Sequence, residues 1–206
     1  MFSSLKEIIK DLKDGKIVCL SDNEDIENEI DMMCLAKFAT PENINYMAHF
    51  ACGFICCVLP HDLCVKKGLD YLKQEGLNQD HRGTPFCAFL DYKECDTGIS
   101  AYERSKTIVK LAQTSKGKNC FVQGHTPVLH AKKGLLRERL GHTEMSSQLS
   151  FMADSNGTAV ICEVLNHDGH MLRVNDFEKW NKDKELKLYS MEQMLKEIFG
   201  SFLSFF

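Results

Sequence analysis

Two spacings of apolar residues run along this chain and predict a mixture of helices and strands. Apolar residues three or four positions apart, as in Leu5, Ile8, Ile9 and Leu12, predict an amphipathic helix. Short continuous apolar runs are instead typical of buried strands. On this basis we predict helices at about residues 3–13, 41–52, 60–68, 100–112, 143–154 and 191–199, strands at 17–20, 54–59 and 86–91, further strands or edges at 121–129, 135–137 and 159–165, and either type at 32–38.

Residues at the predicted helix starts support these bounds. Thr40 is a suitable N-cap for a helix with Pro41 at its first position. Ser100, followed three residues later by Glu103, fits a capping box. Helices and strands do not alternate in a strict rhythm, so we expect residues 1–206 to form a single α+β domain with a mixed sheet.

Composition and charge narrow the class of protein. Of 206 residues, 44% are hydrophobic, and 29 acidic residues outnumber 25 basic ones. This balance argues against a general nucleic-acid binder. Charged residues interrupt the apolar positions of the first helix, so we expect no export signal. The apolar residues 199–206 are too few to span a bilayer, and we expect them to pack on the domain or on a partner subunit.

Ten cysteines bear on the cellular compartment. Most lie in apolar runs, as Cys56, Cys57 and Cys162 do, so we expect small core residues kept reduced in the cytoplasm. A zinc site at Cys52, Cys56, Cys57 and Cys64 is the alternative. The chain has no repeated C-x-x-C pair, and adjacent cysteines on a strand point to opposite faces, so the spacing disfavours zinc.

Residues 22–31 contain six carboxylates, which repel one another unless a cation or a basic ligand lies among them. Glu27, Glu29 and Asp31 share a face if this segment is extended, and Glu27 and Asp31 share one if it is helical. A solvated acidic loop is the alternative interpretation.

Three further segments carry candidate chemistry. Residues 139–144 place Arg139 and His142 at a predicted helix start, where backbone N–H groups favour an anion and a neutral imidazole can bind a metal. An ordinary helix cap is the alternative. His125 lies at a turn next to a strand, where a lone histidine is more often structural. Glu163 lies in an apolar strand, and a carboxylate is costly to bury there unless it is paired.

In their order and spacing these segments resemble the 3,4-dihydroxy-2-butanone 4-phosphate synthases of riboflavin biosynthesis. The family pattern has an E-D-R-E-N-E-G-D loop, a T-T-G-x-S-A-x-D-R segment, a P-G-H turn, an R-x-G-H-T-E motif, and a late C-E strand followed by N-D-D-G. The resemblance covers about residues 5–195 and implies a three-layer domain in which helices flank a mixed sheet. The chain has E-D-I-E-N-E-I-D at 24–31, D-T-G-I-S-A-Y-E-R at 96–104, G-H at 124–125, R-L-G-H-T-E at 139–144, C-E at 162–163 and N-H-D-G at 166–169.

The resemblance implies roles for individual residues. By position, Glu27 and His142 are similar to the family's ligands for a pair of Mg²⁺ (or Mn²⁺) ions. His125 and Glu163 are similar to its proton-transfer residues. Arg139 is similar to a phosphate contact. The substrate contacts implied in this way are Glu27, Glu29, Asp31, Thr97, Arg139, His142, Thr143 and Glu163.

The family converts D-ribulose 5-phosphate to L-3,4-dihydroxy-2-butanone 4-phosphate and formate. The resemblance therefore implies a lyase that acts on a small phosphorylated sugar, as a homodimer with its sites near the subunit interface. Enediolate intermediates concentrate negative charge on adjacent oxygens, which divalent cations stabilise. Carboxylates and one imidazole suit Mg²⁺ or Mn²⁺. Some members carry a fused GTP cyclohydrolase domain, and we expect none here.

Several positions depart from the family pattern. Ile26 stands where the family has an arginine that resembles a second phosphate clamp, and such a contact is worth about 1.5–3 kcal/mol. Ile30 replaces a loop glycine and disfavours a positive φ. Asp96 replaces a threonine. Three interpretations follow: the family reaction with a weaker clamp, the same metal chemistry on another sugar or polyol, or a catalytically impaired homologue with a binding role.

Overall fold

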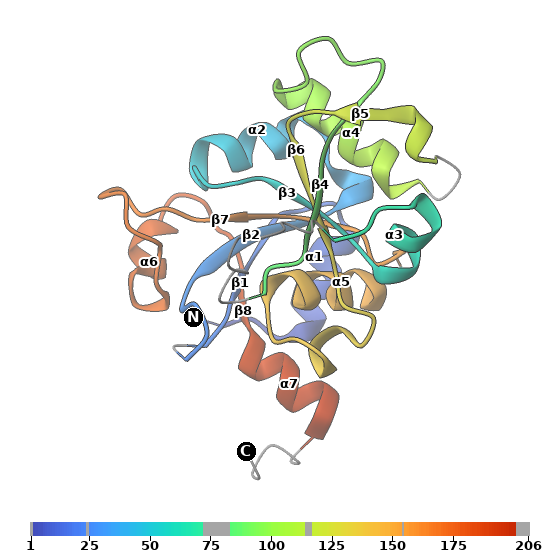
Figure 1. Ribbon diagram of the computed structural model, residues 1–206. Coiled ribbons are helices and arrows are strands. Elements are labelled where there is room, and N and C mark those ends of the chain that lie inside the picture. Colours follow the sequence, from blue (N-terminus) through green and yellow to red (C-terminus); the bar gives the residue numbers. More distant parts are fainter. Residues whose placement is uncertain (1, 24, 72–82, 114–116, 154, 201–206) are drawn as a thin grey trace.

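The protein, described by a computed structural model over residues 2–23, 25–71, 83–113, 117–153 and 155–200, has three layers (Figure 1). In these ranges a mixed sheet of eight strands runs in the order β5-β4-β6-β3-β7-β2-β1-β8. This confirms the predicted α+β class with a mixed sheet flanked by helices. The strands are β1 (Val18–Ser21), β2 (Ile30–Leu35), β3 (Cys56–Leu59), β4 (Phe86–Tyr92), β5 (Phe121–Gln123), β6 (Thr126–His130), β7 (Ala159–Glu163) and β8 (Leu188–Ser190).

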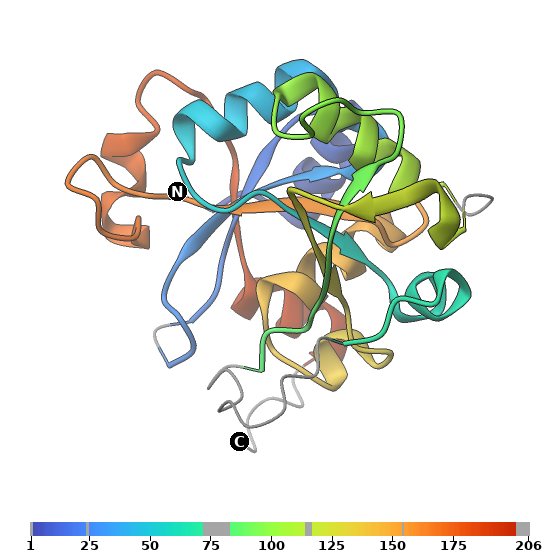
Figure 2. The same cartoon turned by 45° about the horizontal axis from the view of Figure 1, so that its top comes forward.

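Helices cover both faces of the sheet. Figure 2 shows α2 and α4 on one side, with α5 and α7 on the other. Helix α1 packs on the same face as α5. The helices are α1 (Leu5–Lys13), α2 (Pro41–Phe50), α3 (His61–Lys67), α4 (Ala101–Ala112), α5 (His142–Met152), α6 (Phe177–Trp180) and α7 (Met191–Phe199), and the 3₁₀ turns are η1 (Ala36–Phe38), η2 (Lys118–Cys120), η3 (Leu135–Arg137) and η4 (Val174–Asp176).

Strand alternation decides which residues face α5. In β2, Met32 and Cys34 enter the core beneath α2 and α4, while Met33 enters the core beneath α5. Side chains alternate along a strand, so Asp31 shares the face of Met33. Glu163 lies opposite Asp31 in the β2–β7 register. Two carboxylates are therefore side by side on the face that α5 covers.

The structure corrects some of the predicted elements. Residues 135–137 form the 3₁₀ turn η3, and not a strand or edge, because Leu135 adopts a φ of 50° that no strand accommodates. Residues 121–129 form two strands separated at 124–125, and residues 32–38 divide between β2 and η1. Elements β8 and α6 were not predicted. The predicted apolar tail lies outside the described residues from 201 onward.

The cysteines behave as core residues. All ten are free and seven of them are buried, as predicted from their apolar neighbours. Among the described residues, the groups placed to hold a metal include no cysteine. Over the same ranges, no helix has both the length and the apolar character required to cross a bilayer.

Candidate active site

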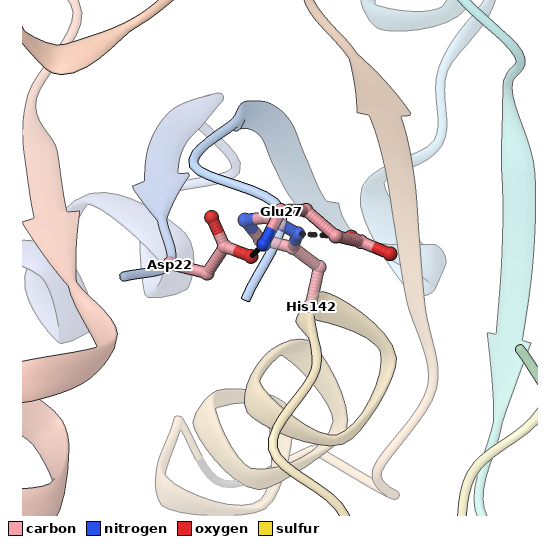
Figure 3. Close-up of side chains that lie close together, drawn as sticks. All are labelled: Asp22, Glu27 and His142. Atoms are coloured by element: carbon pink, nitrogen blue, oxygen red, sulfur yellow. Dashed lines mark hydrogen bonds and ion pairs between the residues drawn. The ribbon is translucent and has the colours of Figure 1, made fainter. Parts of the chain in front are cut away.

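Three side chains from separate parts of the chain converge at the first turn of α5 (Figure 3). Asp22 follows β1, Glu27 lies in the next loop, and His142 begins α5; one ligand atom of each lies within 4.8 Å of the others. His142 Nδ1 is 3.8 Å from Glu27 Oε2 and 3.8 Å from Asp31 Oδ1. His142 Nε2 and Asp31 Oδ1 are buried and have no hydrogen-bond partner among the described residues. Two carboxylates, an imidazole and these buried polar atoms fit a hard divalent cation.

The loop that carries Glu27 is held from two sides. The Asp22 carboxylate accepts hydrogen bonds from the backbone N–H groups of Glu27 and Glu29, each at 2.8 Å. Arg173 Nη1 donates to the carbonyl of Glu27 at 2.7 Å and to that of Asn28. Asn28 has a φ of 55°, which asparagine tolerates better than most residues. The chain therefore turns at Asn28, and the Glu27 backbone is fixed next to His142.

The two isoleucines of this segment are both packed. Ile30 is fully buried as the first residue of β2, in an extended conformation that needs no glycine. Ile26 is partly buried and packs against the core beneath α5. Neither side chain supplies a hydrogen-bond donor, and the positive φ of the loop occurs at Asn28.

The carboxylates and His142 perturb one another. Burial lowers the pKa of His142, but Asp31 and Glu27 outweigh it and raise that pKa to about 9. Burial raises the pKa of Asp31 to about 7, with His142 lowering it and neighbouring carboxylates such as Glu163 raising it. Burial, followed by the Glu27 carboxylate, also raises the pKa of Glu29. This acidic cluster, which we define as Asp22, Glu27, Asp31, His142 and Glu163, thus concentrates negative charge around one imidazole.

The start of α5, next to the cluster, is a candidate anion site. The N-cap Gly141 has no side chain to cap the first N–H groups, one of which belongs to Thr143. Arg139 folds back over Gly141, where a Cβ would collide with its Nη1. Arg139 Nη1 donates to Glu144 Oε2 at 2.7 Å, and the fully buried Glu144 also accepts from the Lys132 backbone N–H at 3.1 Å. Helix N–H groups and a fixed guanidinium can together bind a phosphate.

Glu163 closes the cluster at the end of β7. Its Oε2 accepts a hydrogen bond from the backbone N–H of Phe54 at 3.0 Å. Gly53 approaches so closely that a Cβ would collide with the Glu163 carbonyl oxygen. The side chain of Glu163 is therefore held beside Asp31 while remaining partly accessible.

His125 and Thr97 lie apart from the acidic cluster. The His125 ring Nδ1 is 2.8 Å from Asp91 Oδ2, and the Thr97 hydroxyl donates to Glu103 at 3.1 Å. His125 precedes β6. The start of β6 and the C-terminal end of β7 lie at the same end of the strands. Strands β6, β3, β7 and β2 are successive. At about 4.8 Å per strand, His125 lies on the order of 14 Å from Asp31.

Most of the predicted site residues therefore meet, and some contributors were missed. Glu27, Asp31, His142 and Glu163 form the acidic cluster, with Glu29, Arg139 and Thr143 around it, whereas His125 and Thr97 belong to a second group. Sequence reasoning did not single out Asp22, Asp91, Glu144 or Arg173. The sequence signal that could have identified Asp91 is a carboxylate near the end of an otherwise apolar strand. Arg173 had no such signal, because it contacts backbone carbonyls that are distant in the sequence.

Comparison with known sequences gives a consistent family. The family model described as 3,4-dihydroxy-2-butanone 4-phosphate synthase matches residues 6–197. The riboflavin biosynthesis protein RibBA of Bacillus subtilis (strain 168) is 37% identical over 197 residues, which cover 95% of this chain and 49% of the relative. The 3,4-dihydroxy-2-butanone 4-phosphate synthase of Wolinella succinogenes is 36% identical, covering 93% of this chain and 55% of the relative. The chain spans about half the length of these curated relatives.

Comparison with solved structures points to the same family. A 3,4-dihydroxy-2-butanone 4-phosphate synthase in complex with two magnesium ions is similar with a TM-score of 0.88 and 28% identity, covering 97% of this chain and 99% of that one. The enzyme from Candida albicans is similar with a TM-score of 0.85 and 30% identity, covering 96% and 98%. The fold, the ordered motifs and these matches lead to one conclusion: the chain belongs to the 3,4-dihydroxy-2-butanone 4-phosphate synthase family.

Proposed function

We propose that this chain is a lyase that converts D-ribulose 5-phosphate to L-3,4-dihydroxy-2-butanone 4-phosphate and formate in riboflavin biosynthesis, with residues 1–206 as one catalytic domain. The observation that carries this proposal is the convergence of Asp22, Glu27 and His142, with ligand atoms within 4.8 Å, beside the anion-binding start of α5. A cation site next to a phosphate site suits a small phosphorylated sugar.

Asp22, Glu27 and His142 would hold Mg²⁺ or Mn²⁺. The buried, unpartnered His142 Nε2 and Asp31 Oδ1 favour an ion in this place over a purely structural cluster. We propose two ions per site, the number named for one structural relative. When bound, they supply Lewis-acid stabilisation of negative charge on adjacent substrate oxygens.

The substrate phosphate would bind at the start of α5. Arg139 provides a charged donor held in place by Glu144, and Thr143 provides a hydroxyl and a backbone N–H of the first turn. Ile26 adds no donor, so Arg139 and the helix N-terminus supply the phosphate affinity.

The remaining acidic residues would orient the sugar and move protons. Glu29, beside Arg173, and Asp31, beside His142, would accept hydrogen bonds from sugar hydroxyls. Glu163, partly accessible beside Asp31, is one proton-transfer group, and His125 is the other. Thr97 lies in the loop near His125 and would approach the substrate from that side.

We further propose that a second copy of the chain completes the site in a cytoplasmic homodimer. Within one chain the backbones of His125 and Asp31 are three strand spacings apart, about 14 Å, so we propose that His125 acts on the substrate held at the acidic cluster of the second copy. Phe54, which precedes β3 between these strands, is 46% exposed, and its ring centroid is 6.1 Å from that of Phe89 of β4, which is 37% exposed. The two rings form an apolar surface that another subunit could cover. Mixing two inactive variants, His125→Gln and Glu163→Gln, should restore about a quarter of wild-type activity through mixed dimers with twofold symmetry.

The direct test is incubation of the purified protein with ribulose 5-phosphate and Mg²⁺, with formate and the butanone phosphate measured by NMR. We expect both products in equal amounts, and Glu163→Gln should abolish turnover without changing the melting temperature. Tight Mg²⁺ binding with no product would indicate another sugar or polyol substrate. Failure to bind either Mg²⁺ or a sugar phosphate would indicate a catalytically impaired homologue.

A further inference from the structure

Asp91 makes an unusually complete contact with His125. Its Oδ1 accepts a hydrogen bond from the His125 backbone N–H at 2.9 Å, and its Oδ2 lies 2.8 Å from the ring Nδ1. The Asp91 side chain is 9% exposed, whereas the His125 side chain is 52% exposed. One buried carboxylate therefore fixes both the backbone and the ring of an exposed histidine.

Two glycines enclose this carboxylate. A Cβ on Gly98 would collide with Asp91 Oδ2, and a Cβ on Gly124 would collide with Asp91 Cγ. Gly98 also has a φ of 80°, which most residues rarely adopt. Only glycine lets both backbones approach Asp91 this closely, so the carboxylate has one position available to it.

Glu103 holds the loop that forms one of these walls. Its carboxylate accepts hydrogen bonds from the backbone N–H of Asp96 at 2.6 Å and of Gly98 at 3.0 Å. It also accepts from the hydroxyls of Thr97 and Ser100, each at 3.1 Å. The loop of residues 96–100 is thereby fixed against Asp91, and the segment acts as a rigid support.

We propose that Asp91 is a positioning residue that keeps the His125 proton on Nδ1 and leaves Nε2 as the proton acceptor of the reaction. This inference rests on the proposed function, because it assigns His125 a proton-transfer role. An ionised carboxylate can only accept a hydrogen bond from the ring, so in the neutral ring Nδ1 carries the proton and Nε2 keeps its lone pair.

In this step the His125 ring first accepts a proton and later releases the same proton. As a substrate C–H or O–H bond breaks, its electron pair stays on the substrate and an Nε2–H bond forms. The resulting imidazolium is stabilised by Asp91, which stays ionised. The same proton leaves Nε2 for a later intermediate or for solvent, which restores the starting state of His125.

The first test measures the His125 tautomer directly and does not depend on turnover. In long-range ¹H–¹⁵N spectra of ¹⁵N-histidine-labelled protein, with the His125 signals assigned by His125→Gln, wild-type His125 should carry its proton on Nδ1. Asp91→Asn offers an amide N–H to Nδ1 and should move the proton to Nε2. Asp96→Asn, which removes an exposed carboxylate from the neighbouring loop, should leave the spectrum unchanged.

Kinetics separate positioning from a structural role. Asp91→Asn should lower kcat by at least about a hundredfold, since the wrong tautomer cannot accept a proton. The KM for ribulose 5-phosphate and the Kd for Mg²⁺ by calorimetry should stay within about threefold, because Asp91 lies outside the acidic cluster. Adding Asp91→Asn to His125→Gln should cost nothing more, because both changes remove the same step.

Either of two results would overturn this assignment: wild-type His125 with its proton on Nε2, or an Asp91→Asn enzyme whose kcat is within threefold of wild type. A wild-type protein that does not turn over ribulose 5-phosphate would refute the proposed function instead. The tautomer measurement would still decide the role of Asp91.

Discussion

The acidic cluster and the His125–Asp91 pair lie at the same end of the strands, but their polar atoms are hydrogen-bonded to different extents. In the acidic cluster, His142 Nε2 and Asp31 Oδ1 are buried without hydrogen-bond partners among the described residues. In the His125–Asp91 pair, both Asp91 oxygens accept hydrogen bonds from a histidine whose ring is half exposed. The first region therefore leaves buried polar atoms without hydrogen bonds in the described part of the chain, whereas the Asp91 carboxylate is satisfied by His125.

This difference indicates what each region requires from outside. Buried carboxylates that raise one another's pKa are costly unless a cation joins them, so we expect the acidic cluster to bind a cation. The His125–Asp91 pair is held by its own two contacts, so we expect it to form without a ligand. We therefore expect substitutions in the acidic cluster to change metal affinity, and substitutions in the pair to change turnover alone.

The largest effect should come from Glu27→Gln. This change removes a negative ligand from the group of three, so the Mg²⁺ affinity measured by calorimetry should fall at least about a hundredfold, and activity should be lost with it. Asp25→Asn removes an exposed carboxylate from the same acidic segment and is the matched control. Equal Mg²⁺ affinities for the two variants would contradict a cation site at Glu27.

Arg173→Gln should have a smaller effect on the same region. Arg173 donates to the backbone carbonyls of Glu27 and Asn28 and lies 3.9 Å from the Glu29 carboxylate. Its loss should therefore loosen the loop and weaken Mg²⁺ binding by about tenfold. Hydrogen exchange at the Glu27 and Glu29 amides, which donate to Asp22, should become faster. Unchanged exchange and unchanged affinity would show that Asp22 alone fixes the loop.

Ile26→Arg tests whether position 26 faces the substrate phosphate. A guanidinium there should lower the KM for ribulose 5-phosphate by about tenfold, with some loss of stability because Ile26 packs on the core. Ile26→Gln removes the same apolar packing without adding charge, so its KM should not fall. If both variants show the wild-type KM, position 26 does not face the substrate phosphate.

The sequence pattern was sufficient to predict the main helices and strands and most residues of the acidic cluster. Alternation along β2 and β7 is a local property, and it is what places Asp31 and Glu163 on one face. The short elements were not predictable because three or four residues carry no period: β8 depends on pairing with β1, and η3 depends on the turn at Leu135.

The same reasoning explains which site residues were not predicted from the sequence. Glu27 and His142 stand in segments whose composition is itself unusual. Asp91 becomes significant only when Gly98, Gly124 and His125 meet it from distant parts of the chain. Side-chain contacts of this kind depend on tertiary structure, and no spacing in the sequence specifies them.

The smallest expected effect concerns His130, a buried histidine outside both regions whose pKa is shifted in the opposite direction from that of His142. Burial lowers the pKa of His130 to about 4, with His61 and Lys132 adding to the effect; His130 Nε2 lies 3.0 Å from His61 Nδ1. Because the folded pKa lies below the unfolded value, His130 contributes stability above about pH 6.5 that is lost as the pH falls toward 4.

Between pH 7 and pH 5 this loss should lower the melting temperature of the wild type by about 5 °C relative to His130→Gln, which cannot titrate. His167→Gln, at an exposed histidine, should follow the wild type. Differential scanning fluorimetry of the three proteins across this range provides the measurement. If His130→Gln loses as much stability as the wild type, His130 is protonated in the fold, and burial alone does not distinguish it from His142, whose neighbouring carboxylates hold the proton.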